Sequence, residues 1–174
     1  MELERCIVPF AIYNLAEAGY VYPTWCSLVS WMVYDANTYW SARPRDVMML
    51  VHHAMSVFIA YWLLFFETDN LHLEWCRVAG LLELSGCATT VYTNISSRRY
   101  WDKMVMLSLY CPLRFWHVPK LLMELDAVGA CRVPLTCVWF IVMISAWWVR
   151  RMFLSAFAET TIRLQPASTY LATF

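Results

Sequence analysis

Residues 47–66, VMMLVHHAMSVFIAYWLLFF, form an apolar stretch in which only His52 and His53 titrate near neutral pH. A helix of this length would rise about 30 Å, which is the thickness of the hydrocarbon core of a bilayer. Ionisable side chains inside hydrocarbon are costly, so they usually face a cavity or a partner and often mark a functional site. The first question is therefore which groups the two histidines contact.

The composition of the whole chain agrees with a membrane location. Of its 174 residues, 61% are hydrophobic and only 15% are charged, whereas soluble domains are about 45–50% apolar and about 25% charged. The apolar residues recur in six stretches, at about 6–22, 24–41, 47–66, 75–97, 104–120 and 133–149. We therefore predict an all-α, multi-pass transmembrane helical bundle over residues 1–157, followed by a polar tail at 158–174.

Charge and cysteine content narrow the possible functions. The formal net charge of zero argues against a nucleic-acid partner, because neutralising phosphates requires a basic surface. The seven cysteines form no CxxC pair, so neither a zinc site nor a disulfide framework is indicated. Four histidines are present, but we expect His72 and His117 at the opposite side of the membrane from His52 and His53. We therefore expect no metal site and no cofactor.

Charges in the connecting segments predict the topology. Basic residues gather in three of them, at Arg43 and Arg45, at Arg98, Arg99 and Lys103, and at Arg150, Arg151 and Arg163. The connection after residue 66 instead carries Glu67 and Asp69. Since basic segments stay on the cytosolic side, both termini are expected in the cytosol.

Depth along the helices predicts which buried polar groups can meet. Asp35 lies roughly 10 Å from the cytosolic end of its stretch, and His52 and His53 lie about as deep in theirs. A carboxylate beside an imidazole would orient the ring and raise its basicity. Glu83 and Arg114 also match in depth, beyond the midplane, and we expect them to contact each other.

Each of these groups has two interpretations. Neighbouring helical residues point about 100° apart, so at most one of His52 and His53 can aim fully at a given cavity. That histidine would perform acid–base catalysis or bind a ligand, or both histidines would be structural groups that hydrogen-bond helices together. Glu83 and Arg114 would line a cavity or form a structural pair. The polar residues further along the same stretch, Ser85, Thr89, Thr90, Tyr92 and Asn94, would line a cavity or serve as small packing groups.

An ordered set of short motifs resembles the TLC domain family over roughly residues 20 to 155. These motifs are Val33-Tyr34-Asp35, Asp46 with Leu50-Val51-His52-His53, Leu81-Leu82-Glu83-Leu84-Ser85, Leu113-Arg114-Phe115-Trp116 with Pro119, and Ala146-Trp147-Trp148-Val149-Arg150. The resemblance implies a helical bundle in the endoplasmic reticulum or a related membrane that acts on lipids. The N-terminal part of the domain is shorter here than in that family.

Two branches of the family imply different functions. Ceramide synthases carry paired histidines and join an acyl chain from acyl-CoA to a sphingoid amine, with histidine as the expected acid–base group. They also have further aspartates in the following span, and this chain has none between Asp69 and Asp102. Its Glu83-Leu84-Ser85 element resembles instead the TLCD-type proteins, which are linked to phospholipid composition and membrane fluidity.

The residues and the resemblance support three functional hypotheses. The first is a lipid-homeostasis protein that binds or senses lipid in an intramembrane cavity and influences membrane lipid composition. The second is an acyltransferase of the ceramide synthase type, with acyl-CoA as co-substrate, His52 or His53 as acid–base and Asp35 orienting it. The third is a transporter or a structural membrane partner, although the chain shows no broken helices or repeated halves typical of transporters. Membrane lipids are the expected partners in the first two.

Overall fold

The computed structural model describes residues 4–42, 47–66, 71–95 and 100–164. Every regular element in these ranges is helical, as the sequence predicted. The elements are α1 (Glu4–Glu17), α2 (Val21–Ala42), α3 (Val47–Phe65), α4 (His72–Ile95), α5 (Tyr100–Pro112), the π-helix η1 (Leu113–His117), α6 (Val118–Ala127) and α7 (Arg132–Leu164). Because α5, η1 and α6 succeed one another without a break, these ranges contain six helical rods, in the order of the six expected stretches.

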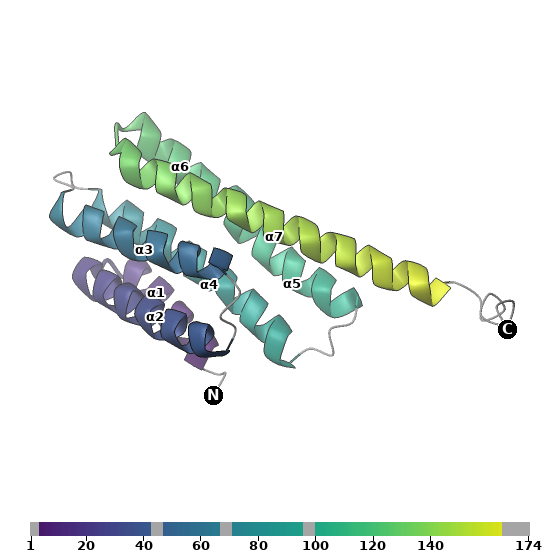
Figure 1. Cartoon of the computed structure of the whole chain (residues 1–174). Helices are drawn as coiled ribbons and strands as arrows, with labels where there is room; N and C mark the ends of the chain where they lie inside the picture. Colours follow the sequence, from purple (N-terminus) through teal and green to yellow (C-terminus); the bar gives the residue numbers. More distant parts are fainter. Residues whose placement is uncertain (1–3, 43–46, 67–70, 96–99, 165–174) are drawn as a thin grey trace, which may run out of the picture.

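The rods run up and down beside one another, with the longest, α7, extending past the others (Figure 1). Helix α4 packs against α1, α2, α5, η1 and α6, while α3 packs against α2 and α7. Both α4 and α3 therefore link the N-terminal helices to the C-terminal ones.

The first two helices meet at a tight turn that the sequence did not predict. Gly19 adopts φ 81°, its N–H donates to Ala16 O at 3.1 Å, and the N–H of Tyr20 donates to Leu15 O at 3.0 Å. This pair of bonds is a Schellman C-cap, which favours glycine at the left-handed position. The expected stretch 6–22 is therefore wrong in its end point, because α1 stops at Glu17 and α2 begins at Val21.

A small-residue contact brings α1 and α4 close together. A Cβ atom added to Gly80 would lie 3.1 Å from Tyr13 Cα and 3.4 Å from Ala16 Cβ. A side chain at position 80 would therefore crowd the backbone of α1, and glycine lets the two helices approach closely.

The C-terminal helices are longer than expected. The fifth rod covers residues 100–127 instead of 104–120, because Pro119 falls in the first turn of α6, where proline is tolerated. Helix α7 continues through Leu164, since no glycine or proline occurs between Pro134 in its first turn and Pro166. The polar tail expected from residue 158 therefore begins inside a helix, and residues 165–174 lie outside the described ranges.

Within the described part of the chain, one helix is long and apolar enough to cross a membrane, namely residues Arg132–Leu154 of α7. Two shorter apolar helices are Ile7–Glu17 and Leu50–Phe65. The helical class of the fold is thus established. That several of its helices cross a membrane is a proposal.

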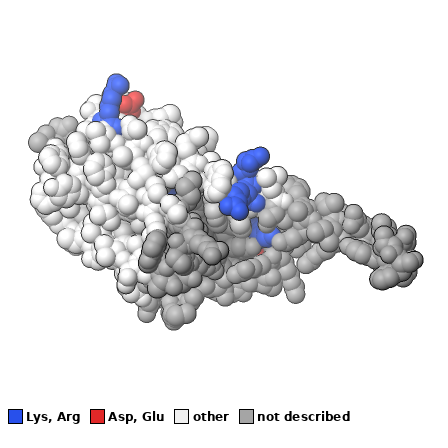
Figure 2. Space-filling view, in the orientation of Figure 1, with Lys and Arg blue, Asp and Glu red and all other residues white. Residues whose placement is uncertain are grey.

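Polar and apolar side chains are distributed in an unusual way. Large apolar residues are exposed on α1, α2, α3, the α5–η1–α6 rod and α7, among them Phe10, Tyr22, Val33, Phe58, Phe65, Trp101, Leu109, Trp116, Phe140 and Met143. Several polar or charged side chains are instead buried, namely Thr24, His53, Ser56, Glu83, Ser85, Lys103, Arg114 and Ser145. In the view of Figure 2, the described surface is mostly uncharged, with Lys, Arg, Asp and Glu confined to a few places.

Candidate functional site

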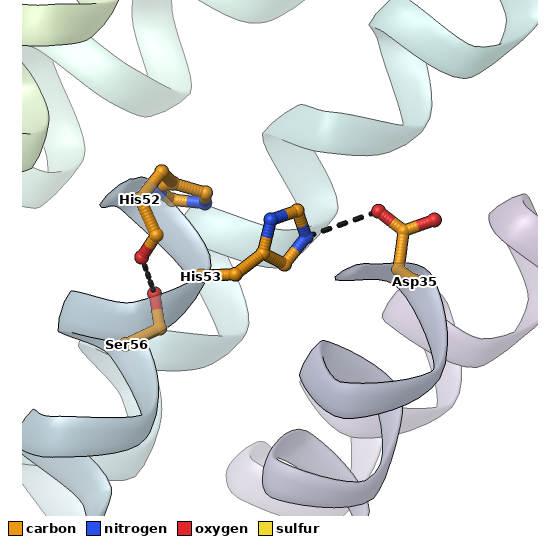
Figure 3. A network of polar contacts seen from close by, with 4 residues as sticks. All are labelled: Asp35, His52, His53 and Ser56. Atoms are coloured by element: carbon orange, nitrogen blue, oxygen red, sulfur yellow. Dashed lines mark hydrogen bonds and ion pairs between the residues drawn. The ribbon is translucent and has the colours of Figure 1, made fainter. Parts of the chain in front are cut away.

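The central contact of the site joins α2 to α3. His53 Nε2 lies 3.0 Å from Asp35 Oδ2, and the imidazole is buried while the carboxylate is nearly so. Figure 3 shows the ring pointing from α3 at the carboxylate on α2. A carboxylate in this position holds the ring in one orientation and stabilises its protonated form. The expected carboxylate–imidazole contact is present, and the structure assigns it to His53.

His52 points in a different direction, as neighbouring helical positions require. Its ring centroid lies 5.5 Å from that of His53, with the planes at 69° (Figure 3). One turn later, Ser56 Oγ donates to the backbone carbonyl of His52 at 3.0 Å. His52 is therefore a neighbour of the Asp35–His53 pair and stands outside the contact itself.

Arg114 ties three helices together from inside the π-helix. Its Nη1 donates to Leu82 O at 2.7 Å and to Ser85 Oγ at 2.9 Å on α4, and its Nε donates to Ser145 Oγ at 2.9 Å on α7. The π-helix is closed by the bond from the Val118 N–H to Leu113 O, and such wide turns often occur at functional sites. A guanidinium satisfied by these oxygens can remain charged although it is buried.

The expected contact between Glu83 and Arg114 is wrong as a salt bridge. Among the described residues, the hydrogen bonds of Arg114 reach only neutral oxygens, on Leu82, Ser85 and Ser145. Leu82 and Ser85 are three residues apart and share one face of α4, whereas Glu83 is turned about 100° from Leu82. The Arg114 guanidinium therefore contacts the face of α4 that carries Ser85 and not the side chain of Glu83.

The Glu83 carboxyl group lies between the two contacts. It is 8% exposed, and Trp31 of α2 is within hydrogen-bonding reach. Arg114, His53 and Asp35 are all near enough to act on its charge, and Arg114 and His53 act likewise on His52. The five titratable groups singled out in the sequence, on α2, α3, α4 and η1, thus form one polar cluster inside the bundle.

Some of the other site residues were predicted from the sequence, and others were missed. Ser85 is fully buried and binds Arg114. The backbones of Tyr92 and Asn94 lie in α4, but their side chains are outside the described residues. Ser145 and Trp31 were missed, although Ser145 is the only hydroxyl between residues 137 and 149 and could have been noticed for that reason.

A narrow pocket adjoins the cluster between α2, α3, α4 and α7. Its volume is about 20 Å³, and it is lined by Trp25, Leu28, Ser56, Ile59, Trp75, Val78, Ala79, Leu82, Glu83, Val138 and Ile141. A space of this size holds about one water molecule. The indole nitrogens of Trp25 and Trp75 are buried and have no hydrogen-bond partner in the described part of the chain. A lipid chain would enter this pocket only if the surrounding helices moved apart.

The described side chains include no group of three or more His, Cys, Asp or Glu residues arranged to hold a metal ion. No protein-family model matches the chain, and the searches of curated proteins and of solved structures found no match either. The resemblance to the TLC family therefore depends on the short sequence motifs around Asp35, His53, Glu83, Arg114 and Trp147, and its functional meaning is a proposal.

Proposed function

We propose that this chain is a multi-pass membrane protein of the TLC type that binds or senses lipid between its helices and influences membrane lipid composition. The observation that carries the proposal is the polar cluster of Asp35, His52, His53, Glu83 and Arg114 inside a bundle whose exterior is apolar.

The distribution of polarity supports a membrane environment for more than α7. In water, the exposed aromatic and aliphatic residues on α1, α2, α3, the α5–η1–α6 rod and α7 would be poorly placed, because large exposed apolar patches mark contact with a membrane or a partner. In a bilayer the same residues contact acyl chains, and charged groups turn inward to meet one another. We propose the endoplasmic reticulum or the plasma membrane as the location, with both termini in the cytosol.

The polar cluster supports a role beyond helix packing. Two imidazoles, two carboxyl groups and a guanidinium are more than a bundle of this size needs to join its helices, and each costs free energy to bury. Perturbed ionisable groups in such a setting are candidates for ligand recognition. The adjoining pocket offers an apolar wall next to the carboxyl group of Glu83, and an amphiphile would fit against that wall once the surrounding helices move apart.

A lipidomic comparison tests the proposal. Cells that express the chain are compared with cells that lack it, and the comparison is repeated with His53→Ala. The control is His117→Ala, because His117 is exposed and lies outside the cluster. We expect a change in phospholipid composition that His53→Ala weakens and His117→Ala preserves. Identical lipid profiles with and without the chain, together with purified protein that retains no lipid, would refute the proposal.

The Asp35–His53 contact favours one alternative, an acyl-CoA-dependent acyltransferase. In that reaction His53 would accept the proton of an attacking amine while the amine nitrogen forms a bond to the thioester carbonyl carbon. The carbon–sulfur bond then breaks, and coenzyme A leaves as a thiol. Asp35 would keep the imidazole oriented and stabilise its protonated form.

This alternative is tested with purified protein, an acyl-CoA and a long-chain amine. Amide formation by the wild type that is lost in both His53→Ala and Asp35→Ala would establish the acyltransferase. Amide formation that survives in His53→Ala would exclude the mechanism, and an inactive wild type with a normal lipidomic effect would leave the sensing role as the function.

A further inference from the structure

A second, polar cleft lies at the corner between α6 and α7, away from the polar cluster. It has a volume of about 250 Å³ and is lined by Asp126, Arg132, Leu135, Thr136 and Trp139. The four lining residues of α7 have the spacing i, i+3, i+4 and i+7, so they share one face of that helix. The turn between α6 and α7 lies at the same end of the bundle as the turn between α1 and α2 (Figure 1).

The cleft presents one positive and one negative side chain that do not neutralise each other. In the described part of the chain, neither the Asp126 carboxylate nor the Arg132 guanidinium has a hydrogen bond or an ion pair. A nearby pair on α6 behaves differently, because Lys120 Nζ and Glu124 Oε1 approach to 3.9 Å. Both charges of the cleft are thus available to a ligand.

The placement of these charges does not help the fold. Asp126 lies in the last turn of α6, where the helix dipole is negative, and Arg132 begins α7, where it is positive. Each charge therefore meets the helix end that disfavours it. A ligand that carries both a cation and an anion would offset both unfavourable placements.

The corner holds the two charges in a defined arrangement. Gly129 has φ 83°, its N–H donates to Asp126 O at 3.1 Å, and the N–H of Ala130 donates to Leu125 O at 3.0 Å. This Schellman motif ends α6, and Ala130 is buried beneath it. The carboxylate and the guanidinium are therefore carried on two helix ends joined by a short, ordered turn.

We propose that this cleft binds the headgroup of a zwitterionic phospholipid. Arg132 contacts the phosphate, with the free N–H groups at the start of α7 adding to the positive field. The headgroup cation contacts the Asp126 carboxylate. Thr136 takes no donor role, because its hydroxyl already donates to the backbone of Arg132 at 2.8 Å.

The apolar surface of α7 beyond the cleft favours a lipid over a soluble zwitterion. The face that carries Arg132 and Trp139 continues to Met143 and Trp147, four and eight residues after the indole, and both are exposed. An acyl chain attached to a headgroup in the cleft would lie along this apolar stripe. The inference rests on the proposed membrane-embedded bundle and adds a lipid class to it.

The test uses the purified full chain in detergent, with binding measured by native mass spectrometry. Three lipids with the same acyl chains are compared: phosphatidylcholine, phosphatidylglycerol and a cationic diacyl lipid without phosphate. We expect phosphatidylcholine to bind about five- to tenfold more tightly than either other lipid, since only it satisfies both charges. Arg132→Gln and Asp126→Asn should each abolish this preference, while the matched controls Lys120→Gln and Glu124→Gln should retain it.

Equal binding of the three lipids, or an unchanged preference in Arg132→Gln, would overturn the inference. Displacement of the lipid by an equal concentration of soluble glycerophosphocholine would show that the headgroup alone is recognised and would overturn the lipid assignment. A chain that is absent from the membrane fraction before purification would instead refute the proposed function, so the two failures are distinguishable.

Discussion

The two buried contacts of the polar cluster satisfy charge in different ways. His53 of α3 meets a carboxylate, that of Asp35 on α2, at 3.0 Å. Arg114 of η1 is also buried in the bundle but meets a backbone carbonyl and two serine hydroxyls. The first contact is a pair between two helices, and the second is a clamp that joins η1 to α4 and α7. Depth along a helix therefore predicts which groups can be neighbours, whereas rotation about the helix axis decides which of them bond.

The largest expected effect comes from removing the clamp. Arg114→Ala should lower the free energy of unfolding by about 3–5 kcal/mol, because it leaves a cavity and removes three charge-assisted hydrogen bonds. Unfolding of the purified protein in detergent measures it. Arg114→Lys should recover less than half of the loss, since an ammonium cannot reach three oxygens on two helices. Full recovery with lysine would show that only the charge matters.

A substitution at the α1–α4 contact tests whether the close packing of these two helices stabilises the bundle. Gly80→Ala should lower the free energy of unfolding by about 1–3 kcal/mol, because the new Cβ would lie 3.1 Å from Tyr13 Cα. Gly86→Ala is the matched control on the same helix, since a Cβ there has nothing within 4 Å. We expect the control to be neutral or slightly stabilising. Similar losses in both variants would show that the loss is not specific to the α1–α4 contact.

A double-mutant cycle tests the pair between α2 and α3. Asp35→Ala and His53→Ala should each lower the free energy of unfolding by about 1–3 kcal/mol, because each removes the 3.0 Å polar contact between α2 and α3. The double variant should show a coupling energy of about 1–2 kcal/mol. The same cycle with Asp35 and exposed His117 is the control and should show no coupling. A zero result for Asp35 and His53 would mean that the contact adds no stability.

The smallest effect is expected at Glu83. Glu83→Gln keeps the shape of the side chain, and Arg114 should lose no direct partner, so the free energy of unfolding should change by less than about 1 kcal/mol. Ser85→Ala is the companion variant, because Ser85 does bond Arg114, and it should cost more. A loss above about 3 kcal/mol in Glu83→Gln would instead indicate that Glu83 forms a salt bridge with Arg114.

The outcomes for individual residues show what a sequence of this kind can predict. The apolar stretches and the charges between them predicted six helical rods, because length and polarity are local properties. The match in depth between Asp35 and the histidines predicted their contact for the same reason. The turn at Gly19 was missed, since the apolar character of residues 6–22 continues across it.

The partners of Arg114 could not be predicted in the same way. A one-residue step along α4 turns a side chain by about 100°, so Glu83 and Ser85 were equally plausible from depth alone. The π-helix adds one residue to a turn and rotates the rest of the rod after it, and the sequence around Leu113–His117 carries no signal that predicts it. Ser145 was reached by Arg114 only because α7 packs against η1.

By itself, the sequence determined the helical class, the order of the helices and the titratable residues that lie within apolar stretches, because these depend on composition and on the constant rise of a helix. Only the tertiary structure decided that His53 and not His52 contacts Asp35, that Arg114 is held by neutral oxygens, and that Asp126 and Arg132 share a cleft. Those outcomes depend on how each helix is rotated and how it is packed against its neighbours, and many distant side chains set both together.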